Sequence, residues 1–283
     1  MAKIANVTVG GKHPVRVMGI LNTSPESFFK KSVNTNKISI KNTVKRMEDE
    51  GADFIDIGGM STAPYLSTLV SEKVESQRIL NAIKITQNHS NLPISVDTCR
   101  AKVARDALEY GVEIINDISG LKYDIEMQQI ISEYRPSLIL CAYDSKIIFG
   151  NSISTAKKLL SESLKIAKKS HISSEKIVLD PAIGFFRKIG KGPFFTKIKS
   201  DYVKRDLDIL KNLNSIKQNF PILISVSNKS FIGNISEKPN PSDRLFGSIA
   251  AETVSVLNGA DIIRTHNVGA TKDAIMIASR LSG

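Results

Sequence analysis

The stretch "DFIDIGG", residues 53–59, followed by "VSEKVESQRILNAIKI", residues 70–85, sets the pattern of the whole chain. The first segment is a short, nearly continuous apolar run that ends on two glycines, and the second is amphipathic. Continuous apolar runs are typical of strands buried on both faces, which parallel sheets require. This part of the chain therefore predicts one strand followed by one helix.

The same strand–helix unit occurs eight times. The other seven strand-like runs lie at 15–21, 93–98, 113–119, 137–143, 176–184, 221–227 and 261–267, each before an amphipathic segment. Gly51, Gly111 and Gly259 each follow a helical pattern and precede a strand, as residues that end helices do. We expect a single α/β domain over residues 1–283, a (β/α)8 TIM barrel. A doubly wound open sheet is the alternative, but the count is eight and no GxGxxG motif follows the first strand.

Composition narrows the class of protein. The 283 residues are 41% hydrophobic and 24% charged, no apolar run reaches the roughly 20 residues of a membrane span, and the first 19 residues lack a signal-peptide core. We therefore expect a cytoplasmic protein that does not contact membranes. Two cysteines without CxxC spacing favour neither a disulfide framework nor a zinc site. The net charge of +11 attracts anions or simply reflects solvated lysines. No nucleic-acid-binding motif is present, so we expect no nucleic acid partner.

Polar residues gather where the predicted strands end. They are Asn22, Asp56 with Thr62, Asp97, Asn116 with Asp117, Asp180, Ser227 with Lys229, and Arg264 with His266; only the fifth strand differs, ending in Cys141 and Tyr143. Any one of them alone could be a turn or capping residue. In a barrel, however, the carboxyl ends of all eight strands meet at one rim, where active sites lie. We therefore predict a site at this rim.

The residue types indicate the ligand. The carboxylates of Asp97 and Asp180 with the amide of Asn116 can read the edge of a flat heterocycle whose N–H groups are paired donors. Lys229 can donate to a ring carbonyl or ring nitrogen. Arg264 and the neighbouring histidine form a cationic corner beside the first strand, and barrels often hold phosphate near strands seven and eight. The pattern predicts a polar heterocycle on one side and a phosphate or diphosphate on the other.

Several long motifs resemble those of the dihydropteroate synthase family. They are "MGILNTSPESF" (18–28), "GADFIDIGGMSTAPY" (51–65), "SVDT" (95–98), "INDISG" (115–120), "LDPAIGF" (179–185), "VSNKSFIG" (226–233), "RLFGSIAA" (244–251) and "GADIIRTHNV" (259–268). The match runs from about Val15 to the C-terminus, with the motifs in the family's order.

The resemblance implies a reaction and its residues. The family joins 6-hydroxymethyl-7,8-dihydropterin diphosphate to an arylamine and releases diphosphate. By resemblance, the pterin would be held by Asp97, Asn116, Asp180, Gly184, Phe185 and Lys229, and the diphosphate by Asn22, Arg264 and His266, with Mg²⁺ bridging it to Asn22. The arylamine would lie among Phe28, Thr62, Pro64 and Ser227, with Phe185 bordering it. Asp97, Asp180, Lys229, Arg264 and His266 would be the catalytic set.

The chain departs from the family where the second substrate would bind. Met60 replaces a glutamate, Ala63 and Asn228 replace arginines, Ala182 replaces a glycine, and the fifth strand ends in "CAY" (141–143). Either another cation, such as Lys30, Lys31 or Arg187 from a loop, pairs with the carboxylate of 4-aminobenzoate, or the arylamine carries a ribose phosphate instead.

Two other functions stay open at this point. One is a pterin-binding domain of a methyltetrahydropterin:corrinoid methyltransferase, which should lack Lys229 and the cationic corner. The other is a non-catalytic barrel that binds pterins or anions. The apolar strip "RLFGSIAAETVSVL" (244–257) packs either on the barrel or on a second subunit, and the family commonly forms homodimers.

Overall fold

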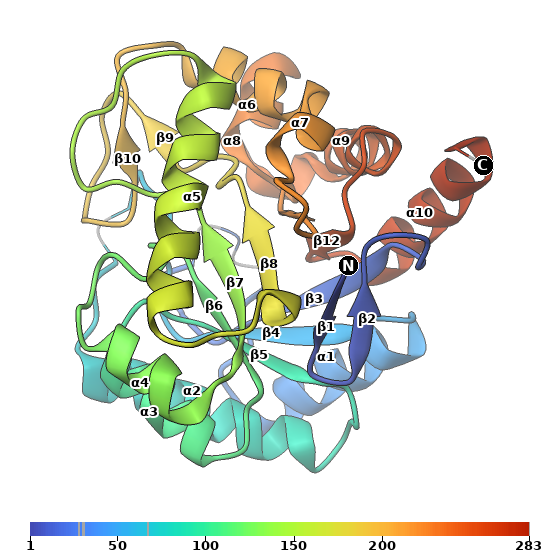
Figure 1. Cartoon of the computed structure of the whole chain (residues 1–283). Coiled ribbons are helices and arrows are strands. Elements are labelled where there is room, and N and C mark those ends of the chain that lie inside the picture. Colours follow the sequence, from blue (N-terminus) through green and yellow to red (C-terminus); the bar gives the residue numbers. More distant parts are fainter. Residues whose placement is uncertain (28, 30–31, 67, 283) are drawn as a thin grey trace.

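A computed structural model describes residues 1–27, 29, 32–66 and 68–282. Its centre is a sheet of eight parallel strands in the order β11-β12-β3-β4-β5-β6-β7-β8 (Figure 1). The strands are β3 (Arg16–Asn22), β4 (Phe54–Gly58), β5 (Ile94–Asp97), β6 (Ile114–Asp117), β7 (Ser137–Cys141), β8 (Ile177–Asp180), β11 (Leu223–Ile224) and β12 (Ile262–Thr265). Seven of them lie inside predicted apolar runs, and β3 extends one residue beyond the run 15–21.

The sheet closes on itself, which confirms the (β/α)8 barrel over the doubly wound alternative. The two ends of the strand order meet where Leu179 of β8 pairs with Ile222 beside β11, and the Leu179 N–H donates to the carbonyl of Pro221 at 2.9 Å. A doubly wound sheet would leave these two strands as separate edges.

Helices surround the barrel (Figure 1). They are α1 (Lys37–Asp49), α2 (Glu72–Gln87), α3 (Ala101–Glu109), α4 (Met127–Tyr134), α5 (Ser152–Lys169), α6 (Tyr202–Lys211), α7 (Leu213–Ile216), α8 (Ser230–Ile235), α9 (Leu245–Leu257) and α10 (Val268–Ser282), with 3-10 turns at Ser174–Lys176 and Pro241–Asp243. Side chains of Asn36, Ser71, Asn151 and Asp201 accept hydrogen bonds from the free backbone N–H groups at four helix starts. In the described part of the chain, every helix is too short or too polar to span a lipid bilayer.

The predicted helix-ending glycines have the conformation that the role needs. Gly51, Gly111 and Gly259 have φ of 87°, 88° and 99°, a left-handed region that other residues enter only with strain. At Gly259 a Cβ would also lie 2.3 Å from the side-chain oxygen of Asn214. These three positions therefore require glycine on backbone grounds.

Some elements lie outside the predicted pattern. The segment 201–216 forms two helices, because the chain breaks at Asn212, whose side chain donates to the carbonyl of Asp208 at 2.8 Å. Helix α8 and the short pair β9 (Phe186–Arg187) and β10 (Thr196–Lys197) also add to the eight units. Figure 1 shows β9 and β10 beyond the arrowheads of β7 and β8, at the rim where the site was expected.

A hairpin at the N-terminus covers the opposite end of the barrel. Strands β1 (Ala2–Ile4) and β2 (Val7–Val9) pair antiparallel. Ala2, Ile4 and Val9 form one buried apolar cluster with Met18, Phe54, Ile114, Ile139, Val178, Leu223 and Ile262, which lie towards the amino ends of seven barrel strands. The barrel interior is therefore filled and dry at this end, so a ligand can enter only from the other.

Candidate active site

The interior of the barrel changes from apolar to polar in one step along the strands. Side chains alternate between the two faces of a strand, so residues two positions beyond the apolar layer also point inward. These residues are Ile20, Asp56, Asn116, Cys141, Asp180, Ser225 and Arg264, and two positions further lie Asn22, Gly58, Ser227 and His266. The alternation thus brings the polar strand ends predicted from the sequence into one layer.

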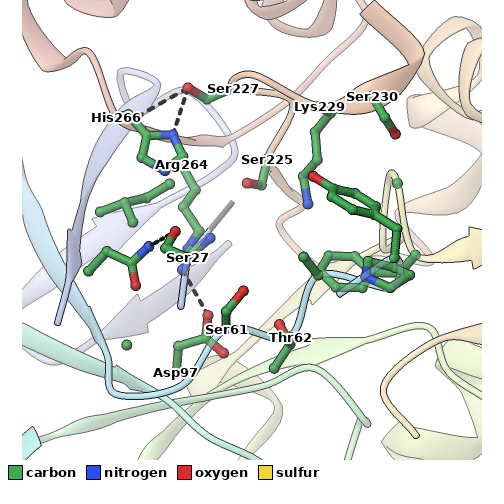
Figure 2. Close-up of a pocket in the computed structure, with 18 of the residues that line it drawn as sticks. Ser27, Ser61, Thr62, Asp97, Ser225, Ser227, Lys229, Ser230, Arg264 and His266 are labelled. Carbon is green, nitrogen blue, oxygen red and sulfur yellow. Dashed lines mark hydrogen bonds and ion pairs between the residues drawn. The ribbon is translucent and has the colours of Figure 1, made fainter. Parts of the chain in front are cut away.

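A pocket opens above this layer (Figure 2). Of the predicted site residues, Asn22, Thr62, Pro64, Asp97, Gly184, Phe185, Ser227, Lys229, Arg264 and His266 line it. Asn116 and Asp180 lie just outside the lining, in contact with residues of the polar layer. Phe28, Lys30 and Lys31 lie outside the described residues.

Arg264 joins the two carboxylates at the pocket floor. Its Nε donates to Asp56 Oδ2 at 2.6 Å and its Nη2 to Asp97 Oδ2 at 2.8 Å. Figure 2 shows the side chain running down from β12 to Asp97. Asn116 Nδ2 also donates to Asp56 Oδ2, at 3.0 Å. Arg264 therefore contacts Asp97, one of the groups predicted to read the heterocycle, and does not lie only in the predicted cationic corner with His266.

Asp56 is a site residue that the sequence reasoning left without a role. Its side chain is fully buried, and Oδ1 has no hydrogen-bond partner among the described residues. The sequence signal for such a role was a carboxylate inside the apolar run "FIDIG". A buried strand tolerates a carboxylate only when hydrogen-bond or ion-pair partners surround it. Burial raises the pKa of the Asp97 carboxyl to about 7; the Arg264 guanidinium opposes this rise and the Asp56 carboxylate adds to it.

Lys229 and Asp180 form the opposite side of the polar layer. Burial, followed by the charge of Arg264, lowers the pKa of Lys229 to about 8, while the nearby Asp180 carboxylate opposes the shift. The lysine Nζ lies 4.1 Å from the centre of the Phe185 ring. Gly184, at φ 84°, lets the lysine stem pass, because a Cβ there would lie 2.9 Å from Lys229 Cδ. Only glycine is compatible with this close approach.

The loop after β8 is held from behind by a buried ion pair. Arg205 contacts Asp206 at 3.0 Å and donates to the carbonyls of Pro181 and Ala182 at 2.6 and 3.3 Å. Asp206 Oδ2 accepts from the N–H of Gly184 at 3.0 Å. Ala182, which stands where the family has glycine, keeps a left-handed φ of 57°. These contacts fix the turn that follows Asp180 and carries Gly184 and Phe185 to the pocket.

His266 is neutral in this structure. Burial, with the charges of Arg264 and Lys229, lowers its pKa to about 3. Its Nδ1 lies 3.0 Å from Ser227 Oγ, which also accepts the backbone N–H of His266 at 3.3 Å. The tautomer with its proton on Nε2 lets the serine hydroxyl donate to Nδ1. His266 is therefore a neutral donor, and the positive charge of the predicted corner comes from Arg264.

Asn22 is the candidate metal ligand. Its Nδ2 donates to Ser27 Oγ at 2.6 Å, which fixes the amide orientation, and no hydrogen bond to Oδ1 occurs among the described residues. Within that part of the chain, no group of three or more His, Cys, Asp or Glu side chains could hold a metal by itself. A single amide oxygen suits Mg²⁺, which commonly takes one or two protein ligands and completes its shell with phosphate oxygens and water.

The loop after β4 forms the remaining wall. Thr62, Pro64, Met60 and Ala63 line the pocket, and the carbonyl of Pro64 accepts the N–H of Lys191 at 2.6 Å. Gly59 is required by packing, because a Cβ would lie 2.8 Å from the carbonyl of Glu75 in α2. The sharp exit from this strand thus depends on close approach to a helix.

Asn228 and Arg187 differ in where they point. Asn228 has a left-handed φ of 59°, is buried, and does not line the pocket; its Oδ1 lies 3.4 Å from Ser248 Oγ. Arg187, expected on a loop, instead belongs to β9, is buried, and lines the pocket. It donates to Ser230 Oγ, and its guanidinium lies 3.8 Å from the centre of the Tyr202 ring.

Comparisons with known proteins place this chain in a family. The family model described as pterin binding enzyme matches residues 18–266. A dihydropteroate synthase from Synechocystis is 33% identical over 273 residues, covering 94% of this chain and 89% of the relative. A dihydropteroate synthase from Coxiella burnetii, solved with pteroic acid, is 35% identical with a TM-score of 0.83, covering 95% and 94% of the two chains. One from Xanthomonas albilineans, solved with 4-aminobenzoic acid, is 27% identical with a TM-score of 0.82, at the same coverage.

Proposed function

The chain belongs to the family of pterin binding enzymes, and from that membership we propose how its pocket carries out the reaction of the dihydropteroate synthases it resembles. It is a transferase of the dihydropteroate synthase type, which condenses 6-hydroxymethyl-7,8-dihydropterin diphosphate with an arylamine. The observation that carries the residue roles is a pocket lined by Asp97, Lys229, Arg264 and His266. Asp56 pairs with Arg264 beneath it, and Asp180 lies near Lys229.

Asp97, Asp180, Asn116 and Lys229 bind the pterin in this proposal. Carboxylates and an amide are complementary to the N–H donors along one edge of the pterin, and the lysine donates to its acceptor atoms. Gly184 and Phe185 border the pterin ring in this proposal. Lys229 Nζ lies above the ring of Phe185. In the ligand-free protein Arg264 occupies one oxygen of Asp97. Pterin binding therefore uses the other oxygen or shifts the arginine.

Arg264, His266 and Asn22 bind the diphosphate. The C–O bond between the pterin methylene and the diphosphate breaks, the arylamine nitrogen bonds to that carbon, and a proton leaves the nitrogen. Arg264 offsets the charge that grows on the leaving diphosphate, and His266 donates through Nε2. Mg²⁺ bound by Asn22 Oδ1 and diphosphate oxygens would add Lewis acidity at the leaving group. The amine is neutral near pH 7, so the protein needs mainly to position it.

The arylamine lies between Phe185, Ser227 and the loop that carries Thr62 and Pro64. These residues line the same pocket as the pterin set, which brings the amine close to the methylene carbon. The predicted contribution of Phe28 stays a prediction.

The test is diphosphate release from pterin diphosphate on addition of 4-aminobenzoate, with Mg²⁺ and with EDTA. We expect release that needs both substrates and falls when the metal is chelated. Titration calorimetry with pterin diphosphate alone separates binding from turnover. Binding without any release would favour the non-catalytic barrel, and unchanged release in EDTA would contradict the role of Mg²⁺.

We also propose that the protein forms a homodimer through α9 and α10. Helix α9 turns polar side chains, those of Ser248, Glu252 and Ser255, towards the barrel. The apolar side chains exposed along its other face are those of Phe246, Ala250, Val254 and Leu257. Helix α10, packed against it, exposes Met276, Ile277 and Leu281. A helix with its apolar side outward needs a partner surface.

The subunit mass in solution tests the dimer. We expect Phe246→Glu to give a monomer by light scattering, and Ile38→Glu, at an equally exposed apolar residue on α1, to leave the mass unchanged. A monomeric unmodified protein would refute the proposal. The single domain over 1–283 and the cytoplasmic location stay predictions.

A further inference from the structure

Three cations line the pocket in the described part of the chain: Lys229, Arg264 and Arg187. The first two are engaged by the polar layer, through Asp180 for the lysine and through Asp56 and Asp97 for Arg264. Arg187 contacts neither Asp180 nor the pair of Asp56 and Asp97. It donates a hydrogen bond to Ser230, which Figure 2 shows on the other side of the view from Arg264 and Asp97.

Arg187 carries a buried guanidinium with a hydrogen-bond donor that is not used. Its side chain is 7% exposed, one arm donates to Ser230, and Nη1 has no hydrogen-bond partner among the described residues. Its plane is held against Tyr202. Burial lowers the pKa of Arg187, as expected of a cation removed from water. A buried cation is normally paired, so this one has a place for an anion.

The protein itself does not supply that anion. No carboxylate in the described residues forms an ion pair with Arg187. The nearest acid in its electrostatic surroundings is Asp206, but Oδ1 of that residue is bound by Arg205 and Oδ2 by the N–H of Gly184. Arg187 therefore lines the pocket without a structural counter-ion, and its Nη1 is a buried donor that no described residue satisfies.

We propose that Arg187 binds the acidic group of the arylamine and so selects a 4-carboxylated amine as the second substrate. This rests on the proposed transferase function. Once the pterin is read by Asp97 and Lys229, the amine must approach from the Thr62 side, and a substituent para to the nitrogen points away from the pterin, towards Ser230 and Arg187. The fork of a guanidinium matches a planar carboxylate.

Two residues that could have supplied this cation do not. Ala63 lines the pocket with a methyl group, and the Asn228 side chain is turned towards Ser248. A carboxylate taken out of water without a partner would be bound weakly or not at all. Arg187 therefore explains how the chain can use a carboxylated amine without a charged side chain at either position.

The test compares amines in the diphosphate-release assay with saturating pterin diphosphate. For Arg187→Gln we expect kcat/KM with 4-aminobenzoate to fall about 30-fold, mainly through KM, the equivalent of about 2 kcal/mol. With 4-methylaniline, which lacks the charge, the fall should be less than about 3-fold. The KM for pterin diphosphate should not change. Lys188→Gln removes a neighbouring exposed cation and should behave as the unmodified protein.

Two further variants separate binding from structure. Arg187→Lys keeps the charge and should retain part of the preference for the carboxylated amine. Ala63→Arg added to Arg187→Gln supplies a cation to the same pocket and should restore 4-aminobenzoate use. Thermal unfolding of each variant reports whether the fold persists. If Arg187→Gln fails to fold, the same amine comparison is made with Arg187→Lys.

Three outcomes would overturn the proposal. An equal loss for both amines in Arg187→Gln, and likewise in Arg187→Lys, would show a structural role. A clear preference of the unmodified protein for an arylamine bearing a ribose phosphate would show that the group is a phosphate. No preference for 4-aminobenzoate over 4-methylaniline would show that no anion is read. Absence of release with every amine would instead refute the transferase function itself.

Discussion

Replacing Arg264 by methionine tests the electrostatic centre of the site. The substitution keeps much of the volume of the side chain and removes its charge. Arg264 is the cation between Asp56 and Asp97, with hydrogen bonds of 2.6 and 2.8 Å. Without it, two carboxylates of the same polar layer lose their shared partner, and one of them is fully buried.

The magnitude follows from those two contacts. A hydrogen bond to a charged group contributes about 1.5–3 kcal/mol, and breaking a buried ion pair costs about 3–5 kcal/mol. We therefore expect Arg264→Met to lower the free energy of unfolding by about 3–5 kcal/mol at pH 8.5. The loss should be smaller at pH 5.5. The pKa of Asp97 is raised to about 7, so its carboxyl is mostly protonated at pH 5.5 and leaves no unpaired charge there.

The assay is urea denaturation at pH 5.5 and 8.5, followed by circular dichroism. Arg16→Met is the matched control, because Arg16 pairs with Asp53 at 3.1 Å at the opposite end of the barrel and is partly exposed. Such a pair contributes about 0–1 kcal/mol. Adding Asp56→Asn to Arg264→Met should recover part of the lost free energy of unfolding, because it removes one of the two unpaired carboxylate charges.

A loss below about 1 kcal/mol at pH 8.5, or an equal loss at both pH values, would refute this reasoning. So would a double variant no more stable than Arg264→Met alone. Where the variant is folded, calorimetry should show no measurable binding of pterin diphosphate.

Other predictions concern buried groups of the barrel. Burial raises the pKa of Glu252 from 4.5 to about 7, so its stabilising contribution is full below pH 4.5 and is lost as the pH rises through 7. The unmodified protein should therefore lose at most about 3 kcal/mol of its free energy of unfolding between pH 4.5 and pH 8 from this group. Urea denaturation at the two pH values should show that Glu252→Gln removes this loss. With the pKa of Lys229 lowered to about 8, kcat/KM for pterin diphosphate should fall above pH 8, and Lys229→Arg, if active, should move that limb upward; an unmoved limb would exclude the lysine. Gly184→Ala should abolish turnover, since its Cβ would meet the Lys229 stem and its φ is 84°; normal kinetics would show that the turn adapts.

The strand–helix order and the rim of the site were predictable because both depend on local pattern. Eight apolar runs alternate with amphipathic segments, and a parallel barrel brings all their carboxyl ends to one side. Asp97, Lys229, Arg264 and His266 line the same pocket for that reason, and their roles there stay predictions. The α9 strip left two possibilities, and the structure shows its apolar face exposed.

The sequence by itself determined which residues of the barrel strands could reach the pocket, since the period of two along each strand orders its side chains. Only the tertiary structure decided which residues pair there. Asp56 and Arg264 are 208 positions apart and meet because β12 lies beside β3 and β3 beside β4. Arg187 reaches the pocket because β9 and β10 pair beyond the barrel, and Asn228 turns away through one left-handed residue. Such contacts depend on closure of the sheet and on single backbone angles, neither of which has a local sequence signal.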